Sequence, residues 1–326
     1  MSQRGADIQV VAVPYDSAHR GRRMGAGPTH LVARGLLDRL RDAGRRVDLR
    51  ELAPSDGTWA AEIGTAFDLD RQLAGLVASA RSRGVFTLTL AGNCITSVGA
   101  VAGLGGGART GVLWFDAHGD FNTPETTLGG FQDGMALAAV VGRCWTALAN
   151  GIPGFAPVPE ENVVLVGARD LDPAESELLA ASAIVHLRPD EAPGRLDAEL
   201  EALARRIDAL YVHVDLDVLD GGEGLVNAYS GGPGLSRGEL LEAIAAAGRR
   251  CQVLAGAITL TIRGTTWTAA SDAQRSTWRS PWPTPRPPPS PRNWNTGVGV
   301  RFRGDSTLAR GARVRRTHAR GNGRQP

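Results

Sequence analysis

Residues 111–124 read GVLWFDAHGDFNTP, an apolar run that leads directly into Asp116, His118 and Asp120. The run Gly111–Phe115 has the composition of a buried β-strand, and alternate residues of an extended segment point to one side. We therefore expect the three polar side chains to leave the carboxyl end of a strand together. This pattern is typical of α/β proteins, which bind ligands outside the carboxyl ends of parallel strands.

A second stretch repeats the arrangement later in the chain. The expected strand Ala209–Val214 runs into DLDVLD, which places Asp215 and Asp217 just past its end. If the two strands are neighbours in a parallel sheet, both acidic sets meet above one sheet edge. The alternative is that each aspartate only caps a turn or helix, which fits DLD alone better than it fits both motifs together.

The chain up to about residue 260 alternates β-rich runs with amphipathic ones, which predicts a parallel sheet covered by helices. The expected strands are 8–13, 85–91, 111–115, 162–166, 183–187, 209–214 and 252–260, and the expected helices are 27–43, 60–83, 173–181, 194–207 and 236–249. Ser236 and Glu239 predict a capping box, and Asp172 before Pro173 predicts a second helix start.

Composition limits the class of protein. The chain has 326 residues, of which 42% are apolar, so it can build a packed core. Apolar stretches such as Met135–Val141 are far shorter than the roughly 20 residues of a membrane span, and the N-terminus has no signal pattern. Three scattered cysteines suggest a reducing compartment. We therefore expect a cytoplasmic protein with no membrane partner.

The sequence changes character after about Thr261. Residues 262–326 contain thirteen arginines, two acidic residues and four of the seven tryptophans, and seven prolines lie between positions 281 and 291. We expect two parts, a folded domain over 1–261 and an Arg/Pro/Trp-rich tail over 262–326. The tail is either a natural disordered extension or the product of an out-of-frame reading. Nucleic-acid binding through it is less favoured, because its arginines form no helix face or known module.

The acidic residues point to a metal centre. Carboxylates gathered in one crevice repel one another unless cations lie among them. Four aspartates are neutralised by two divalent ions, and an oxygen-rich set with one imidazole suits Mn²⁺. Two ions about 3.5–4 Å apart can share a water, lower its pKa and present hydroxide to an electrophilic carbon. A two-metal hydrolytic centre is the resulting hypothesis.

Here the sequence resembles the ureohydrolase family, which comprises the arginases, agmatinases and formiminoglutamases. The motifs that carry the resemblance are GRRMGAGPTHL at 21–31, AGNC at 91–94, DAHGDFNTP at 116–124, GARDLDPAE at 167–175, VDLDVLD at 214–220 and GGPGLS at 231–236. The resemblance covers about residues 7–261. It implies a three-layer α/β/α sandwich around a mainly parallel eight-stranded sheet, a dinuclear manganese centre and hydrolysis of a C–N bond in a linear guanidino or amidine compound. Family members also form homo-oligomers through the region after residue 261.

The resemblance assigns a role to each metal ligand. Asp116 and Asp215 would bridge the two ions, Asp120 would complete one site, and His118 with Asp217 would complete the other.

The same resemblance assigns Asp172, Glu175 and Asn122 to substrate binding. The acidic pair matches positions that hold the α-amino group of the substrate in arginases, and carboxylates suit an ammonium. The alternative for the pair is a helix cap with a first-turn acid, which is compatible with the binding role.

One departure affects a metal ligand. The family usually has glycine-glycine-aspartate-histidine where this chain has AGNC, so Cys94 occupies the place of a histidine ligand and Asn93 that of a supporting carboxylate. A thiolate is a softer ligand and adds negative charge, so the first site would be weakened or would prefer Zn²⁺. The alternative is a buried, inert thiol.

Other departures affect catalysis and specificity. Asp133 replaces a histidine that shuttles protons in arginases, so proton transfer passes to Asp133, passes to bulk water or is lost. The catalytic candidates are His118 and Asp133. Phe131 replaces a small polar residue that reaches the substrate carboxylate, so it either lines an apolar pocket or packs within its loop. Ile262 stands where arginases place a substrate-binding glutamate.

These observations favour a metal-dependent hydrolase of guanidino compounds. The departures favour a modified arginine such as N-hydroxyarginine over arginine itself. The alternative is a catalytically lost family member that serves as a metal-binding or regulatory scaffold. His213, which precedes the DLD aspartates where many relatives carry serine, is expected to be a core histidine or to lie behind the metal ligands.

Overall fold

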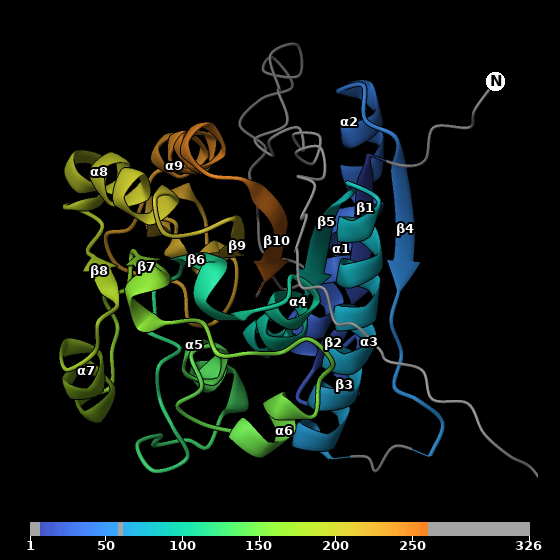
Figure 1. Cartoon of the computed structure of the whole chain (residues 1–326), viewed down its shortest axis with the longest axis horizontal. Helices are drawn as coiled ribbons and strands as arrows, with labels where there is room; N and C mark the ends of the chain where they lie inside the picture. The colour runs from blue at the N-terminus through green and yellow to red at the C-terminus, as the bar shows by residue number, and fades with distance from the viewer. Residues whose placement is uncertain (1–6, 58–60, 260–326) are drawn as a thin grey trace, which may run out of the picture. The chain divides into compact units, whose positions relative to one another are not determined.

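The computed structural model describes residues 7–57 and 61–259, which contain a sheet of eight parallel strands (Figure 1). The strand order is β4-β1-β5-β10-β9-β6-β7-β8. The strands are β1 (Ile8–Val13), β4 (Val47–Glu51), β5 (Phe86–Ala91), β6 (Thr110–Phe115), β7 (Val163–Val166), β8 (Val185–Leu187), β9 (Ala209–Asp215) and β10 (Val253–Thr259), and a separate antiparallel pair is formed by β2 (Tyr15–Asp16) and β3 (His19–Arg20). The predicted α/β fold is confirmed.

The central strands supply two hydrophobic cores, one on each face of the sheet. On β6, Val112 and Trp114 belong to one core, whereas Leu113 and Phe115 belong to the other. Helices α3 (Glu62–Ser82), α4 (Ser97–Gly103), α5 (Ala136–Val140), α6 (Thr146–Asn150) and α7 (Pro173–Ala180) contribute to the first core; α1 (Gly27–Ala33), α2 (Leu36–Asp42), α8 (Ala192–Ala204) and α9 (Arg237–Arg250) contribute to the second. The arrangement is a three-layer α/β/α sandwich, and burial on both faces explains the continuous apolar strands.

The structure corrects the predicted elements at several places. Residues 27–43 form two helices instead of one, because Gly35 adopts a left-handed conformation with φ of +87° between them. Strand β4 has the sequence VDLRE and is half exposed at the sheet edge, so it lacks the apolar pattern of the inner strands. The predicted capping box of α9 is confirmed. The predicted helix start at Asp172 is also found, and there Asp172 and Glu175 form a capping box that was not predicted.

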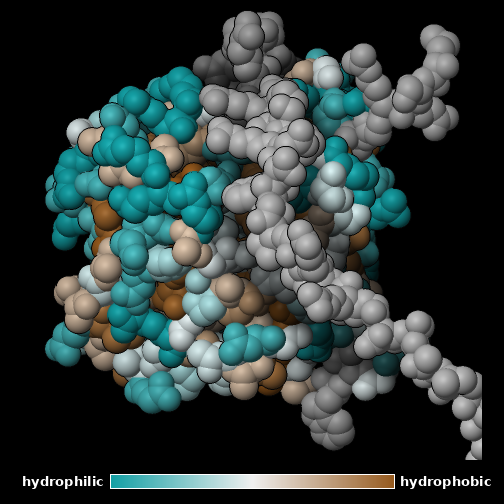
Figure 2. All heavy atoms as spheres, in the orientation of Figure 1, coloured by the Kyte–Doolittle hydropathy of each residue, from teal (hydrophilic) through white to brown (hydrophobic). Residues whose placement is uncertain are grey.

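The outer sides of α8 and α9 are hydrophilic on the face shown in Figure 2. An ion pair between Arg250 and Asp197 joins these two helices. Among the described residues, no helix has the length and apolar character needed to cross a membrane. The predicted tail, residues 262–326 with Ile262, lies outside the described residues.

The strand order places the polar motifs together. β6 and β9 are hydrogen-bonded neighbours with Phe115 opposite Val214, and β10 and β5 follow on the other side of β9. The carboxyl ends of these four parallel strands therefore meet at one sheet edge, as the sequence predicted for the two acidic motifs.

Candidate metal centre

One group of possible metal ligands lies above the ends of β6 and β9. The backbone N–H of His118 donates to Oδ1 of Asp116 at 2.8 Å, and its Nδ1 lies 3.2 Å from the same oxygen. Nδ1 is also 3.5 Å from Oδ2 of Asp217. One donor atom from each of the three residues lies within 4.8 Å of the others. Sequence reasoning assigned all three to the metal centre, and the structure brings them together.

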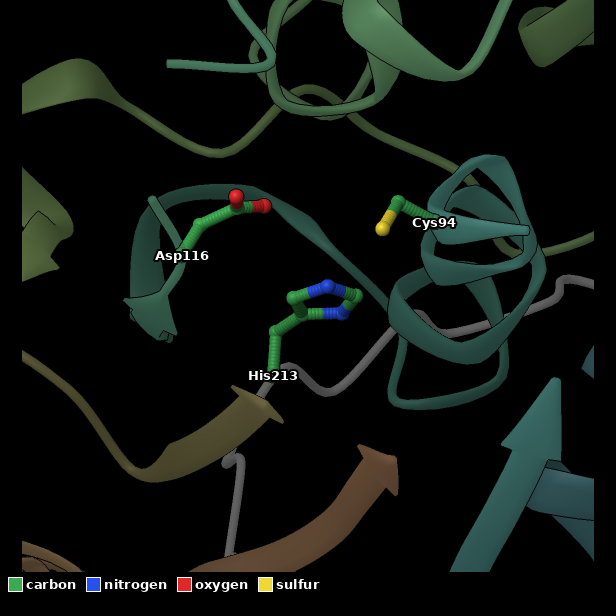
Figure 3. A group of neighbouring side chains, drawn as sticks. All are labelled: Cys94, Asp116 and His213. Atoms are coloured by element: carbon green, nitrogen blue, oxygen red, sulfur yellow. The ribbon is translucent and has the colours of Figure 1, made fainter. Parts of the chain in front are cut away.

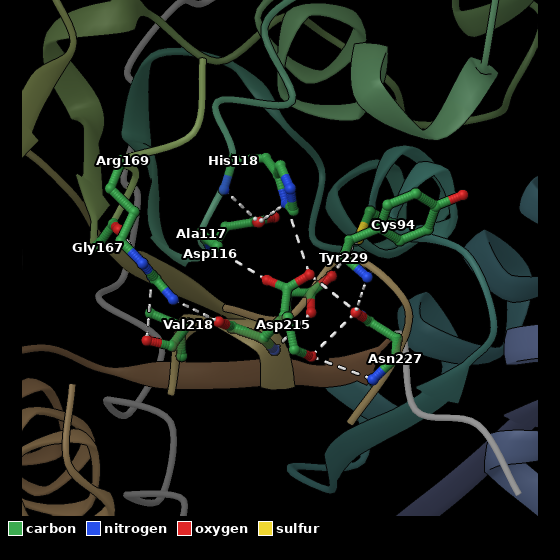
Figure 4. A network of polar contacts seen from close by, with 12 residues as sticks. Cys94, Asp116, Ala117, His118, Gly167, Arg169, Asp215, Val218, Asn227 and Tyr229 are labelled. Atoms are coloured by element: carbon green, nitrogen blue, oxygen red, sulfur yellow. Dashed lines mark hydrogen bonds and ion pairs between the residues drawn. The ribbon is translucent and has the colours of Figure 1, made fainter. Parts of the chain in front are cut away.

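Two other predicted ligands, Cys94 and Asp215, lie beside this group (Figure 4), and the charges of Asp116 and Asp217 act on the third, Asp120. Sγ of Cys94 is 3.4 Å from Oδ2 of Asp215, and both side chains are fully buried. Asp120 is buried and has a φ of +48°. Its backbone carbonyl oxygen accepts hydrogen bonds from the N–H groups of Leu137 and Ala138, which hold the residue in place. Within the described part of the chain, Oδ2 of Asp120 has no hydrogen-bond partner. An unpartnered carboxylate oxygen in the interior is costly unless it binds a cation.

The electrostatics of the cluster also call for cations. Burial raises the pKa of Asp120, Asp215 and Asp217, and neighbouring carboxylates raise it further. Burial also acts to raise the pKa of Asp116, but hydrogen bonds from His118 outweigh it and the net shift is downward. Burial disfavours the imidazolium of His118, yet the bond to Asp116 and the charge of Asp217 raise its pKa to about 9. A raised pKa means that the group tends to keep its proton, which lowers the negative charge of the cluster. Divalent cations bound here would neutralise the carboxylates in place of these protons.

The donor set fits two divalent ions. Asp116 belongs to the group with His118 and Asp217, and it also belongs to a second group with Cys94 and His213. The first group offers oxygens and one imidazole, a set that suits Mn²⁺. The second contains a sulfur and a second imidazole, which are softer donors. The described residues therefore contain two groups of potential ligands that share Asp116.

His213 lies on the same side of β9 as Asp215, behind the ligands. Its Nδ1 is 3.0 Å from Oγ of Ser97, its Nε2 is 3.2 Å from Oγ1 of Thr259, and its ring stacks on Trp114 with centroids 3.7 Å apart. Burial lowers the pKa of His213 to about 3, so the ring is neutral. The expectation of a hydrogen-bonded core histidine holds, but the ring also adjoins two predicted ligands.

Asp133 supports the loop that carries Cys94. Its Oδ2 accepts from Nδ2 of Asn93 at 2.8 Å and its Oδ1 from the N–H of Ile95 at 2.9 Å. Burial raises the pKa of Asp133 to about 7, although both hydrogen bonds act in the opposite direction. The carboxyl group therefore fixes the backbone on both sides of Cys94 and titrates near neutrality.

The predicted substrate residues meet at the start of α7. Asp172 and Glu175 form the capping box, and Oε1 of Glu175 also accepts from the N–H of Phe121 at 2.8 Å. Nδ2 of Asn122 donates to Oδ2 of Asp172 at 3.2 Å. Glu175 is buried and Asp172 is partly exposed, so Asp172 is the more accessible carboxylate of the pair.

Phe131 is linked to the cluster through the ring of Tyr229. Its ring lies 6.3 Å from that of Tyr229, which in turn makes an edge contact of 6.3 Å with His118. The guanidinium of Arg23 lies 5.6 Å from the Phe131 centroid and pairs with Asp16 at 3.0 Å. A chain of ring contacts thus leads from His118 through Tyr229 and Phe131 to the guanidinium of Arg23.

Two residues that sequence reasoning missed hold the DLD loop (Figure 4). Nδ2 of Asn227 donates to Oδ2 of Asp217 at 3.1 Å. The guanidinium of Arg169 donates to five backbone carbonyls, those of Gly167, Asp217, Val218, Leu219 and Gly231, at 2.9–3.3 Å. Arg169 lies inside the GARDLDPAE motif, so the motif itself was the available signal.

Comparison with known proteins gives consistent matches. A family model described as the arginase family matches residues 6–253. The chain is 31% identical over 229 residues to an arginase of Bacillus caldovelox, covering 65% of this chain and 76% of that protein. It is 41% identical over 113 residues to N(omega)-hydroxy-L-arginine amidinohydrolase of Streptomyces lavendulae, covering 34% and 37%. The structure of Bacillus subtilis arginase matches with a TM-score of 0.70 at 28% identity, covering 79% of this chain and 91% of that chain.

Proposed function

The chain belongs to the arginase family, and from that premise we propose that it hydrolyses a C–N bond of a linear guanidino or amidine compound and releases urea or an analogue. The observation that carries the proposal is the convergence of Asp116, His118, Asp120, Asp215 and Asp217 at one sheet edge. Within it, a buried carboxylate oxygen of Asp120 has no partner among the described residues.

We propose two divalent cations as cofactors, with Mn²⁺ favoured by the oxygen-rich group. Asp116 and Asp215 would contact both ions, His118 and Asp217 would complete one site, and Asp120 with Cys94 would complete the other. When bound, such ions act as Lewis acids and lower the pKa of water toward neutrality. Asn227 and Arg169 hold the loop of Asp217 in place, so this ligand is positioned before any ion binds.

The chain's own residues would position the substrate. Asp172 is the proposed contact for the substrate ammonium, since Glu175 already accepts from two backbone N–H groups, and Asn122 orients Asp172. Phe131 would lie along the substrate chain. Asp133 is the proposed proton carrier, because a carboxyl group with a pKa of about 7 exchanges protons readily at neutral pH.

We propose a hydroxylated guanidinium, as in N-hydroxyarginine, as the preferred substrate. The local similarity to the Streptomyces lavendulae amidinohydrolase supports this choice. Three free cysteines among the described residues support a reducing compartment such as the cytoplasm.

The test is product release from purified, Mn²⁺-loaded protein offered arginine, agmatine and N-hydroxyarginine. Urea or hydroxyurea release that is highest with N-hydroxyarginine and is lost in Asp120→Asn supports the proposal. Failure to cleave any of the three by a protein that binds two ions per chain would favour the alternative, a metal-binding scaffold, for which Cys94 in place of a histidine ligand is the supporting observation.

A further inference from the structure

A buried group of sulfur, nitrogen and oxygen donors lies beneath the carboxylate cluster. Cys94, Asp116 and His213 each offer one donor atom, and these atoms lie within 4.8 Å of one another (Figure 3). The three residues follow β5, follow β6 and lie on β9, respectively, so the sheet fixes their mutual positions. The imidazole edge faces the space between the Asp116 carboxylate and the Cys94 sulfur.

We propose that Nε2 of His213 and Sγ of Cys94, together with carboxylate oxygens of Asp116 and Asp215, form a metal site selective for Zn²⁺ over Mn²⁺. With Zn²⁺ bound, His213 would take the place of Asp120 as the fourth ligand of the site that Cys94 completes. The inference rests on the proposed metal centre, but it does not depend on the hydrolysis of any substrate. It assigns to His213 a ligand role for which the DLD motif gave no indication.

The geometry around Cys94 suits a tetrahedral ion. Zinc bonds of about 2.0–2.3 Å place tetrahedral donors roughly 3.3–3.8 Å apart. Sγ of Cys94 and Oδ2 of Asp215 are already 3.4 Å apart. The donors of the three-residue group are at most 4.8 Å apart, a separation that small side-chain rotations can reduce.

The surroundings of His213 allow the tautomer that a ligand needs. Ser97 Oγ lies 3.0 Å from Nδ1 and 2.9 Å from the hydroxyl of Tyr211. If Nδ1–H donates to Ser97 and the Ser97 hydroxyl donates to Tyr211, the lone pair of Nε2 is directed toward the group. A ligand histidine characteristically donates its other ring N–H in this way. Stacking on Trp114 holds the ring orientation.

Thr259 occupies the position between the two soft donors. Its Oγ1 is 3.3 Å from Sγ of Cys94 and 3.2 Å from Nε2 of His213. The carbonyl of Val214, at 3.4 Å, is a second acceptor for the same hydroxyl. The hydroxyl can therefore turn to Val214 and release Nε2 when an ion binds. Coordination converts the thiol to a thiolate and releases its proton to solvent.

The donor set predicts metal preference. Thiolate and imidazole favour Zn²⁺ and Co²⁺ over Mn²⁺ in the order of divalent affinities, and thiolate adds selectivity for soft ions. The neighbouring group of Asp116, His118 and Asp217 contains no sulfur and keeps its preference for Mn²⁺. One chain would then hold two different metals.

The test uses Co²⁺ alone as a spectroscopic probe of full-length protein freed of metal. The parent is expected to show a thiolate-to-cobalt charge-transfer band in the near ultraviolet. Cys94→Ser should abolish it, and the matched controls Cys144→Ser and Cys251→Ser, which remove two other buried thiols, should retain it. A band that persists in Cys94→Ser, or that is missing from the parent, would overturn the assignment.

His213→Asn tests the imidazole, because the asparagine amide can still donate to Ser97 but has no atom at the Nε2 position. We expect a Zn²⁺ dissociation constant at least about 10–100-fold higher than in the parent, the range seen even for groups that only support a ligand. The Mn²⁺ affinity of the other site should stay unchanged. An unaltered Zn²⁺ affinity would reduce His213 to a packing residue, and thermal unfolding without metal separates that outcome from misfolding.

The outcomes also separate this site from the proposed function. A cobalt band without product release supports the site and contradicts the hydrolase. Product release with Mn²⁺ and no thiolate band supports the hydrolysis but contradicts both this site and the ligand role of Cys94.

Discussion

Arg169 offers a direct test of how the DLD loop is held. Of its five hydrogen bonds to backbone carbonyls, four join the loop after β7 to residues 217–219 and to Gly231, and the fifth goes to Gly167 within that loop. The change Arg169→Met keeps most of the side-chain stem and removes every donor. Hydrogen bonds from charged groups contribute about 1.5–3 kcal/mol when measured singly, but bonds from one group are not additive. Because the bonds are not additive and the side chain is partly exposed, the total is far below the sum of five such bonds. We expect a loss of roughly 2–4 kcal/mol in the free energy of unfolding.

The assay is urea unfolding of metal-free protein, with Arg205→Met as the control. Arg205 pairs with Glu201 on the exposed surface of α8, so its loss should cost at most about 0.5 kcal/mol. A lower midpoint with an unchanged slope would show a loss of stability without a change in the surface exposed on unfolding. If Arg169→Met loses no more stability than Arg205→Met, the bonds of Arg169 do not hold the loop.

Three further predictions concern substrate binding, pH and backbone packing. Asp172→Asn keeps the helix cap but removes the negative charge, so kcat/KM for a substrate with an α-ammonium should fall about 10–100-fold while thermal stability is retained. Unchanged kinetics would exclude the ammonium contact. Because the pKa of His118 is raised to about 9 in the folded protein, its protonated ring stabilises the metal-free fold below pH 6.5, and this contribution is lost as pH rises through 9. The free energy of unfolding should therefore drop by up to roughly 3 kcal/mol over that range. A free energy of unfolding that does not change with pH over that range would contradict the shift. Gly92→Ala would place a Cβ 2.3 Å from the carbonyl oxygen of Tyr15, so thermal unfolding should show a loss of about 1–3 kcal/mol in stability. The control is Gly75→Ala, whose new Cβ meets no neighbour and which must therefore be less affected.

The fold and the acidic cluster could be predicted because both follow from local pattern. Apolar runs buried on both faces indicate parallel strands, and the side chains after their carboxyl ends share one edge, as Asp116 and Asp215 do. Strand β4 could not be found in this way, since its polar sequence reflects an edge position that only the assembled sheet defines. The break at Gly35 depends on a single backbone conformation.

The supporting residues of the site were harder to predict. Arg169 acts on carbonyl oxygens, which every residue possesses, so its sequence gives no sign of its partners. Asn227 reaches Asp217 from a loop whose path is not encoded by any period. The sequence predicts a core position for His213 but not its neighbours. Its place in β9 does not indicate that it meets side chains that follow β5 and β6.

Metal content measured for the parent and for Asp215→Asn tests the central claim most directly. The claim is that side chains from two strand ends jointly hold a pair of divalent ions. After equilibrium dialysis against Mn²⁺ and Zn²⁺ and elemental analysis, we predict two ions per chain in the parent and at most one in the variant. A parent that retains no stoichiometric metal, or a variant that retains both ions, would contradict the account.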